Sequence, residues 1–172
     1  MHFFIEMGQG IIWKSAYHVS TSTLYSCTLI AGIGAGGYAG AFHYPTNALD
    51  SDPDCVKDMD LWASTLQPSQ IILVHALNVN TEFVAMEGGT PVGDKRGLRQ
   101  WALQKCGNPP TVREGVHTGM ELTSAGAFAA GKRSYLESSF SEISKVDLSR
   151  KPAGHFLDFG GYGLVGKNRE TG

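Results

Sequence analysis

The 172-residue chain has few cysteines and few charged residues, and each shortage excludes a class of protein. Its three cysteines, Cys27, Cys55 and Cys106, form no C-x-x-C pair and are odd in number. This excludes a disulfide framework and a zinc site of the common cysteine type. The net charge of −2 gives no reason to expect nucleic acid or an anionic membrane as a partner. The six histidines lack H-x-x-x-H spacing, so we expect no metal site.

The sequence also lacks a long apolar run. No stretch approaches the roughly 18 residues of a membrane-spanning helix. The first ten residues, MHFFIEMGQG, have neither the basic residues nor the long apolar segment of a signal peptide. We therefore expect a soluble, cytoplasmic protein. A bacterial effector that is secreted into a host cell without a signal peptide would have the same features.

Two segments of the sequence are typical of helices. Residues 53–66 follow Asp52, a good capping residue, and begin with Pro53, which suits a first helical turn. Residues 94–106 form the second segment, which ends before Gly107. The two helices therefore occupy the middle third of the chain.

Short β-like segments precede, separate and follow these helices, including two around a turn at Gly8–Gly10. This order predicts an α+β fold, a layered domain with mixed or antiparallel β-sheets and about two helices. We expect a single catalytic domain over residues 1–166 and a flexible tail over residues 167–172.

Three glycines, Gly32, Gly34 and Gly37, have the G-x-G-x-x-G spacing of a dinucleotide-binding turn. Such a site needs a helix that begins at the third glycine. The following residues, YAGAFHYP, are too rich in glycine, aromatic residues and proline for that helix. The segment is better interpreted as a hairpin turn. A turn centred on Ala35 would place Cys27 opposite His43, with Cβ atoms about 4.5–5.5 Å apart.

A thiol beside an imidazole can act as a nucleophile. A free thiol has a pKa near about 8.5, whereas a neighbouring histidine can share its proton and form a thiolate–imidazolium pair. A third group usually orients the imidazole, and Thr21, Ser22 and Thr23 are nearby candidates. The alternative is that Cys27 is a buried apolar residue of a non-catalytic, β-rich interaction module.

The stretch TSTLYSCTLI, with the glycine-rich turn and AFHYP that follow, resembles the cysteine-dependent glutamine deamidases. These include the chemotaxis deamidase CheD and the toxins of the cytotoxic necrotising factor and Burkholderia lethal factor type. In those families a threonine lies about six residues before the cysteine and a histidine about sixteen after it. Thr21 and His43 have this spacing from Cys27.

The resemblance implies a CheD-like fold, a role in virulence if the protein is a toxin, and a protein substrate that carries a target glutamine. Cys27 would attack the glutamine amide, His43 would transfer protons, and Thr21 would orient the imidazole by its side chain or backbone. Ser26, Tyr25 and Tyr44 would contact the substrate. Tyr25 stands where CheD has glycine, which changes the mouth of the pocket. No cofactor or metal is required. A transglutaminase or another thiol hydrolase could use the same pair of residues.

The sequence indicates structural roles for three of the remaining cysteines and histidines. Cys55 and Cys106 lie in the predicted helices without a histidine at matching spacing. His75 lies in an apolar run and is interpreted as a hydrogen-bonded core residue. His117 and His155, which lie near glycines, are weaker candidates for lining a site.

Overall fold

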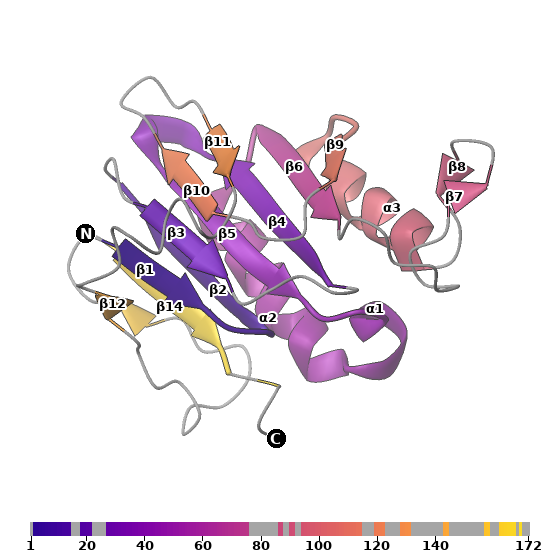
Figure 1. Cartoon of the computed structure of the whole chain (residues 1–172), viewed down its shortest axis with the longest axis horizontal. Coiled ribbons are helices and arrows are strands. Elements are labelled where there is room, and N and C mark those ends of the chain that lie inside the picture. The colour runs from indigo at the N-terminus through magenta and orange to yellow at the C-terminus, as the bar shows by residue number, and fades with distance from the viewer. Residues whose placement is uncertain are drawn as a thin grey trace.

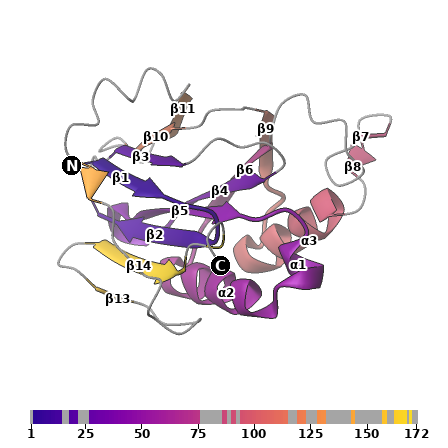
Figure 2. The same cartoon turned by 60° about the horizontal axis from the view of Figure 1, so that its bottom comes forward.

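A computed structural model of the chain shows a layered α+β arrangement (Figures 1 and 2). It describes residues 2–14, 18–21, 27–75, 86–87, 90–91, 94–114, 119–122, 128–131, 143–144, 157–158, 162–167 and 169. Within these residues, a seven-stranded sheet lies between a five-stranded sheet and a layer of helices. The predicted α+β class and the mixed sheets are confirmed.

The seven-stranded sheet forms the middle layer. Its strands, in spatial order, are β13 (Leu157–Asp158), β14 (Tyr162–Gly166), β2 (Gln9–Trp13), β5 (Ala39–Tyr44), β4 (Thr28–Ile33), β6 (Gln70–His75) and β9 (Thr111–Glu114). All neighbours are antiparallel except β6 and β9, which are parallel.

The five-stranded sheet covers one face of the middle layer. Its strands, in order, are β11 (Phe128–Gly131), β10 (Gly119–Leu122), β3 (His18–Thr21), β1 (His2–Ile5) and β12 (Ile143–Ser144). Strand β1 is parallel to both β3 and β12. The turn that joins β1 to β2 ends at Gly8, since Gln9 and Gly10 already belong to β2, and the two strands lie in different sheets. A separate small pair consists of β7 (Met86–Glu87) and β8 (Thr90–Pro91).

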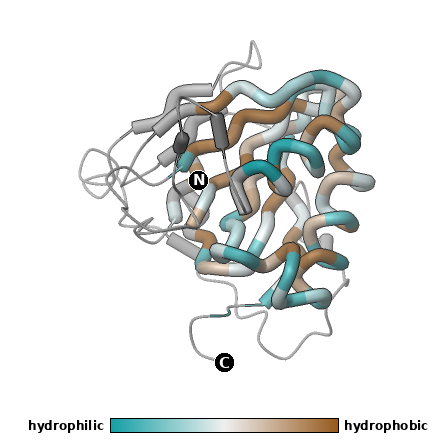
Figure 3. The backbone as a smooth tube through the Cα atoms, turned by 90° about the vertical axis from the view of Figure 1, so that its right-hand side faces the viewer, coloured by the Kyte–Doolittle hydropathy of each residue, from teal (hydrophilic) through white to brown (hydrophobic). Residues whose placement is uncertain are grey.

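The helices cover the other face of the middle layer. Helices α2 (Pro53–Leu66) and α3 (Asp94–Cys106) have the predicted bounds, and a short helix, α1 (Ala48–Ser51), precedes them. Asp52 caps α2 as predicted, because its Oδ1 accepts a hydrogen bond of 2.9 Å from the Cys55 amide. Hydrophobic and hydrophilic residues alternate along these helices (Figure 3), as expected for helices with one buried face.

The middle sheet separates two apolar cores, and alternation along its strands decides which core each side chain enters. Leu29 and Ala31 of β4 pack between the two sheets. Ile30, between them in sequence, packs against the helices. Trp62 of α2 fills the centre of the helix-side core, and its Nε1 donates a hydrogen bond of 3.1 Å to the Ile11 carbonyl.

The glycine-rich segment is a hairpin turn, not the start of a long helix. Strands β4 and β5 are joined through a single 3-10 turn, Ala35–Gly37, in which Gly36 and Gly37 have φ of 67° and 79°. These positive φ values favour glycine. The predicted register is wrong by two residues, because the turn is centred on Gly36 and Leu29 therefore pairs with His43. A shift of two residues keeps every side chain on its predicted face.

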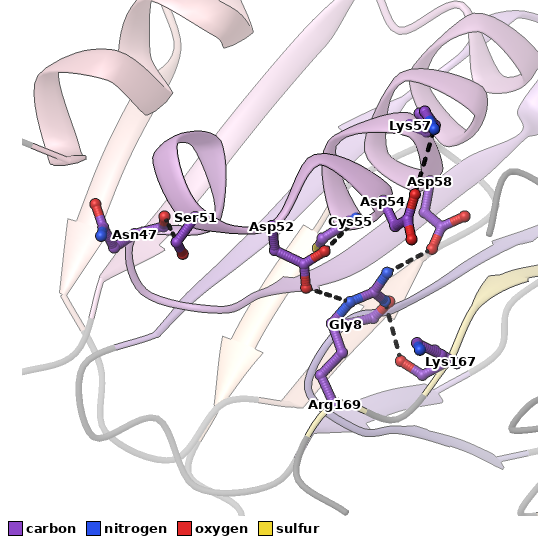
Figure 4. A network of polar contacts seen from close by, with 10 residues as sticks. All are labelled: Gly8, Asn47, Ser51, Asp52, Asp54, Cys55, Lys57, Asp58, Lys167 and Arg169. Carbon is purple, nitrogen blue, oxygen red and sulfur yellow. Dashed lines mark hydrogen bonds and ion pairs between the residues drawn. The ribbon is translucent and has the colours of Figure 1, made fainter. Parts of the chain in front are cut away.

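The C-terminal segment differs from the predicted flexible tail at Arg169. This side chain is only 7% exposed and forms ion pairs with Asp52 and Asp58 of the α2 region (Figure 4). Its backbone amide also donates a hydrogen bond of 2.8 Å to the Met7 carbonyl. The prediction missed this anchor because its partners lie far away in the sequence.

Candidate active site

Thr21 and His43 meet between the two sheets. Thr21 ends β3 of the five-stranded sheet, and His43 lies in β5 of the seven-stranded sheet. Thr21 Oγ1 lies 2.7 Å from His43 Nδ1, and both side chains are buried. The side chain of Thr21 therefore makes a contact that can orient this imidazole.

Cys27 lies directly before β4, at the same end of the sheet. Leu29 occupies the position opposite His43 that was predicted for Cys27. Because strand side chains alternate, Cys27 shares a face with Leu29 and His43, and it packs against the core between the sheets. Cys27 and His43 are therefore diagonal neighbours, a relationship in which Cα atoms lie about 7–8 Å apart. Cys27 is partly exposed, whereas His43 is buried.

Burial governs the protonation of His43. Removal from solvent lowers the pKa of this imidazole from 6.5 to about 3, although a hydrogen bond with the Ile5 backbone opposes the effect. The ring is therefore neutral at neutral pH. The expected thiolate–imidazolium pair is not favoured in this arrangement, because the charged ring would be buried. A neutral imidazole retains a nitrogen lone pair that can accept a proton.

The three residues expected to contact the substrate have different outcomes. Tyr25 and Ser26 lie outside the described residues. The expectation for Tyr44 is wrong, because this side chain points to the face opposite His43 and is buried in the helix-side core. Its hydroxyl accepts a hydrogen bond of 3.1 Å from the Leu49 amide, which gives it a structural role at the start of α1.

Two of the remaining candidates, Cys55 and His75, are buried, as their structural interpretation predicts. Cys55 is buried in the first turn of α2, and burial raises the pKa of its thiol to about 12. Cys106 is a free thiol in the last turn of α3. His75 is buried, with Nδ1 2.8 Å from Thr28 Oγ1. His117 and His155 lie outside the described residues.

Sequence reasoning missed the residues that join β1 to β2. This crossing between the sheets passes through Met7 and Gly8. Met7 Sδ lies 3.6 Å from Cys27 Sγ, and the Gly8 amide donates a hydrogen bond of 2.8 Å to the His43 carbonyl. The Gly8–Gly10 turn was visible in the sequence, but its approach to Cys27 depends on the strands entering different sheets.

Comparison of the sequence with models of protein families finds no match. Comparison with curated proteins likewise finds no match. Across the part of the chain that the structure describes, no cluster of three or more His, Cys, Asp or Glu side chains is arranged to hold a metal ion. The described helices include none with the length and apolar character needed to cross a membrane.

Proposed function

We propose that the chain is a protein-glutamine deamidase in which Cys27 is the nucleophile and His43 the proton acceptor. The observation that carries the proposal is the hydrogen bond of 2.7 Å between Thr21 and His43, on the sheet face that Cys27 shares. A nucleophile, a base and a group that orients the base are the three parts of a thiol hydrolase site. The resemblance of residues 20–45 to the glutamine deamidases supports glutamine as the substrate.

In the first step, the sulfur attacks the carbonyl carbon of a glutamine side-chain amide while its proton passes to neutral His43, so that the buried imidazolium forms only together with the negative oxyanion that balances its charge. The diagonal placement fits a site without substrate, because catalytic hydrogen bonds are often long until the substrate binds. Backbone amides around Cys27 are candidates for stabilising the oxyanion. His43 then returns the proton to the departing nitrogen, so that ammonia leaves and a thioester remains.

In the second step, water attacks the thioester carbon and loses a proton to His43. The carbon–sulfur bond breaks, the product is glutamate, and the proton returns to Cys27. If an amine replaces water, the same thioester gives a transglutaminase product. The chemistry needs neither a metal nor a cofactor.

The test is ammonia release from glutamine-containing proteins, with conversion of glutamine to glutamate followed by mass spectrometry. We expect Cys27→Ala to abolish the reaction and His43→Gln to slow it by roughly 10²–10⁴-fold. Cys106→Ser is the matched control, because Cys106 is also a partly exposed free thiol but lies at the end of α3. It should retain full activity.

Product analysis separates the proposal from its alternatives. Chain cleavage would indicate a peptidase, and incorporation of an added amine in preference to water would indicate a transglutaminase. The proposal fails if ammonia release persists in Cys27→Ala. It also fails if Cys27 in the folded protein is inert to iodoacetamide while Cys106 reacts, since a nucleophile must be accessible to its substrate.

A further inference from the structure

The link between the two sheets contacts both members of the candidate site. Met7 places its thioether sulfur 3.6 Å from the Cys27 sulfur. Gly8, the next residue, donates its amide hydrogen to the carbonyl of His43 at 2.8 Å. We call residues Met7 and Gly8 the crossing turn. If this turn moved, the space beside the Cys27 thiol would change. The position of β5, the strand that carries His43, would change with it.

Arg169 fixes the crossing turn through two hydrogen bonds. Its backbone amide donates to the Met7 carbonyl at 2.8 Å, and its Nη1 donates to the Gly8 carbonyl at 3.0 Å. Gly8 has φ of 89°, and a Cβ atom there would lie 2.7 Å from Arg169 Cδ. Glycine is therefore required at this position both for the backbone conformation and for the close approach of the arginine.

Arg169 is itself held by two carboxylates at the start of α2 (Figure 4). Nε lies 2.7 Å from Asp52 Oδ2, and Nη2 lies 3.0 Å from Asp58 Oδ2. Asp58 is fully buried. The planar guanidinium can bind two carboxylates and a carbonyl at once, which a lysine ammonium cannot do in the same geometry. The crossing turn is thus connected through Arg169 to the first two turns of α2.

We infer that Met7 is the wall of the site beside the nucleophile and that Arg169 is a positioning residue that holds this wall in place. The inference rests on the proposed function, because a wall matters only if substrates approach Cys27. A glutamine side chain is an unbranched stem that ends in a flat amide, and it needs only narrow access to the thiol. The wall therefore favours slender side chains over bulky groups.

The experiment compares the rates at which a small reagent, iodoacetamide, and a bulky maleimide modify Cys27. In Met7→Ala we expect the bulky-to-small rate ratio to rise about tenfold, which corresponds to about 1.4 kcal/mol. Met7→Leu retains the size of the side chain and should keep the wild-type ratio. Arg169→Met should raise the ratio as Met7→Ala does. Arg169→Lys retains the positive charge but lacks the planar guanidinium that binds two carboxylates and a carbonyl at once. It should give an intermediate ratio.

Asp54→Asn is the matched control for Arg169, because it removes an exposed ion pair with Lys57 in the same turn of α2. It should leave the ratio unchanged. Reaction through global unfolding would expose Cys55 together with Cys27, so modification of Cys55 is followed in every sample. If Arg169→Met does not fold, Met7→Ala and Arg169→Lys still decide the outcome.

If the bulky-to-small rate ratio is unchanged in Met7→Ala, Met7 is not the wall of the site. If the folded Arg169 variants keep the wild-type ratio, Arg169 does not position Met7. Either failure leaves ammonia release by the wild-type protein intact. Conversely, a changed ratio without any Cys27-dependent ammonia release means that the wall exists but the proposed function is wrong.

Discussion

Thr21 Oγ1 and His43 Nδ1, 2.7 Å apart, join the two β-sheets through a buried hydrogen bond. Because no water can replace a lost partner without entering the core, we expect Thr21→Val to lower the free energy of unfolding by about 1–3 kcal/mol. Thr21→Ser keeps the hydroxyl and should recover most of this loss. Urea unfolding of the three proteins gives the comparison. Equal stability of Thr21→Val and the wild type would contradict the role of the bond.

The buried imidazole predicts a pH dependence of stability. Burial lowers the pKa of His43 from 6.5 to about 3, so the unfolded chain binds a proton that the folded protein does not hold between these pH values. The free energy of unfolding should therefore fall as the pH decreases from 6.5 towards 3. His43→Gln lacks this group, so the difference in free energy of unfolding between this variant and the wild type should change between pH 6.5 and pH 3. Urea unfolding at pH 7, 5 and 4 measures it, and a constant difference would contradict the burial.

The ion pair between Arg169 and Asp58 predicts a large loss of stability. Asp58 is fully buried, so Asp58→Asn leaves a largely buried guanidinium with one fewer carboxylate. We expect the free energy of unfolding to fall by roughly 3 kcal/mol. Asp54→Asn, which removes an exposed pair, should change it by less than about 1 kcal/mol. Thermal and urea unfolding provide the measurement, and similar losses in both variants would sink this expectation.

The helix-side core predicts opposite effects of two glycine substitutions. A Cβ atom on Gly32 would lie 2.7 Å from Leu66 Cδ2 and 3.1 Å from Trp62 Cη2, so Gly32→Ala should lower stability by about 1–3 kcal/mol. Gly97 lies within α3, and its nearest contact would be 3.5 Å away. Gly97→Ala should therefore raise stability by roughly 0.5–1 kcal/mol through its helix propensity. Urea unfolding distinguishes these outcomes, and a stable Gly32→Ala would show that α2 can shift.

Local signals determined which parts of the fold were predictable. Helix α2 has the predicted bounds because Asp52 and Pro53 act on neighbouring residues. The hairpin was also predicted, but its register was not, because the turn centre depends on the backbone angles of Gly36 and Gly37. Because the register is shifted by two residues, an even number, Cys27 and His43 still lie on the same face of the sheet.

Contacts between distant residues were not predictable from local patterns. The parallel pairing of β1 with β3, and hence the meeting of Thr21 with His43, depends on packing between two sheets. The expectation for Tyr44 failed because this residue directly follows His43 in β5. Side chains alternate along a strand, so its ring points towards the helices. The anchoring of Arg169 gave no signal, since its carbonyl partner Gly8 is 161 residues away.

That separation sets the order in which the site can form during protein synthesis. Thr21, Cys27 and His43 leave the ribosome well before Arg169, whose two hydrogen bonds to the crossing turn form later. Translation at about 5–20 residues per second leaves several seconds between these events. A nascent chain that ends before Arg169 would contain every proposed catalytic residue but lack the clamp that holds Met7 beside the thiol. The assembled site therefore depends on synthesis of the chain as far as Arg169.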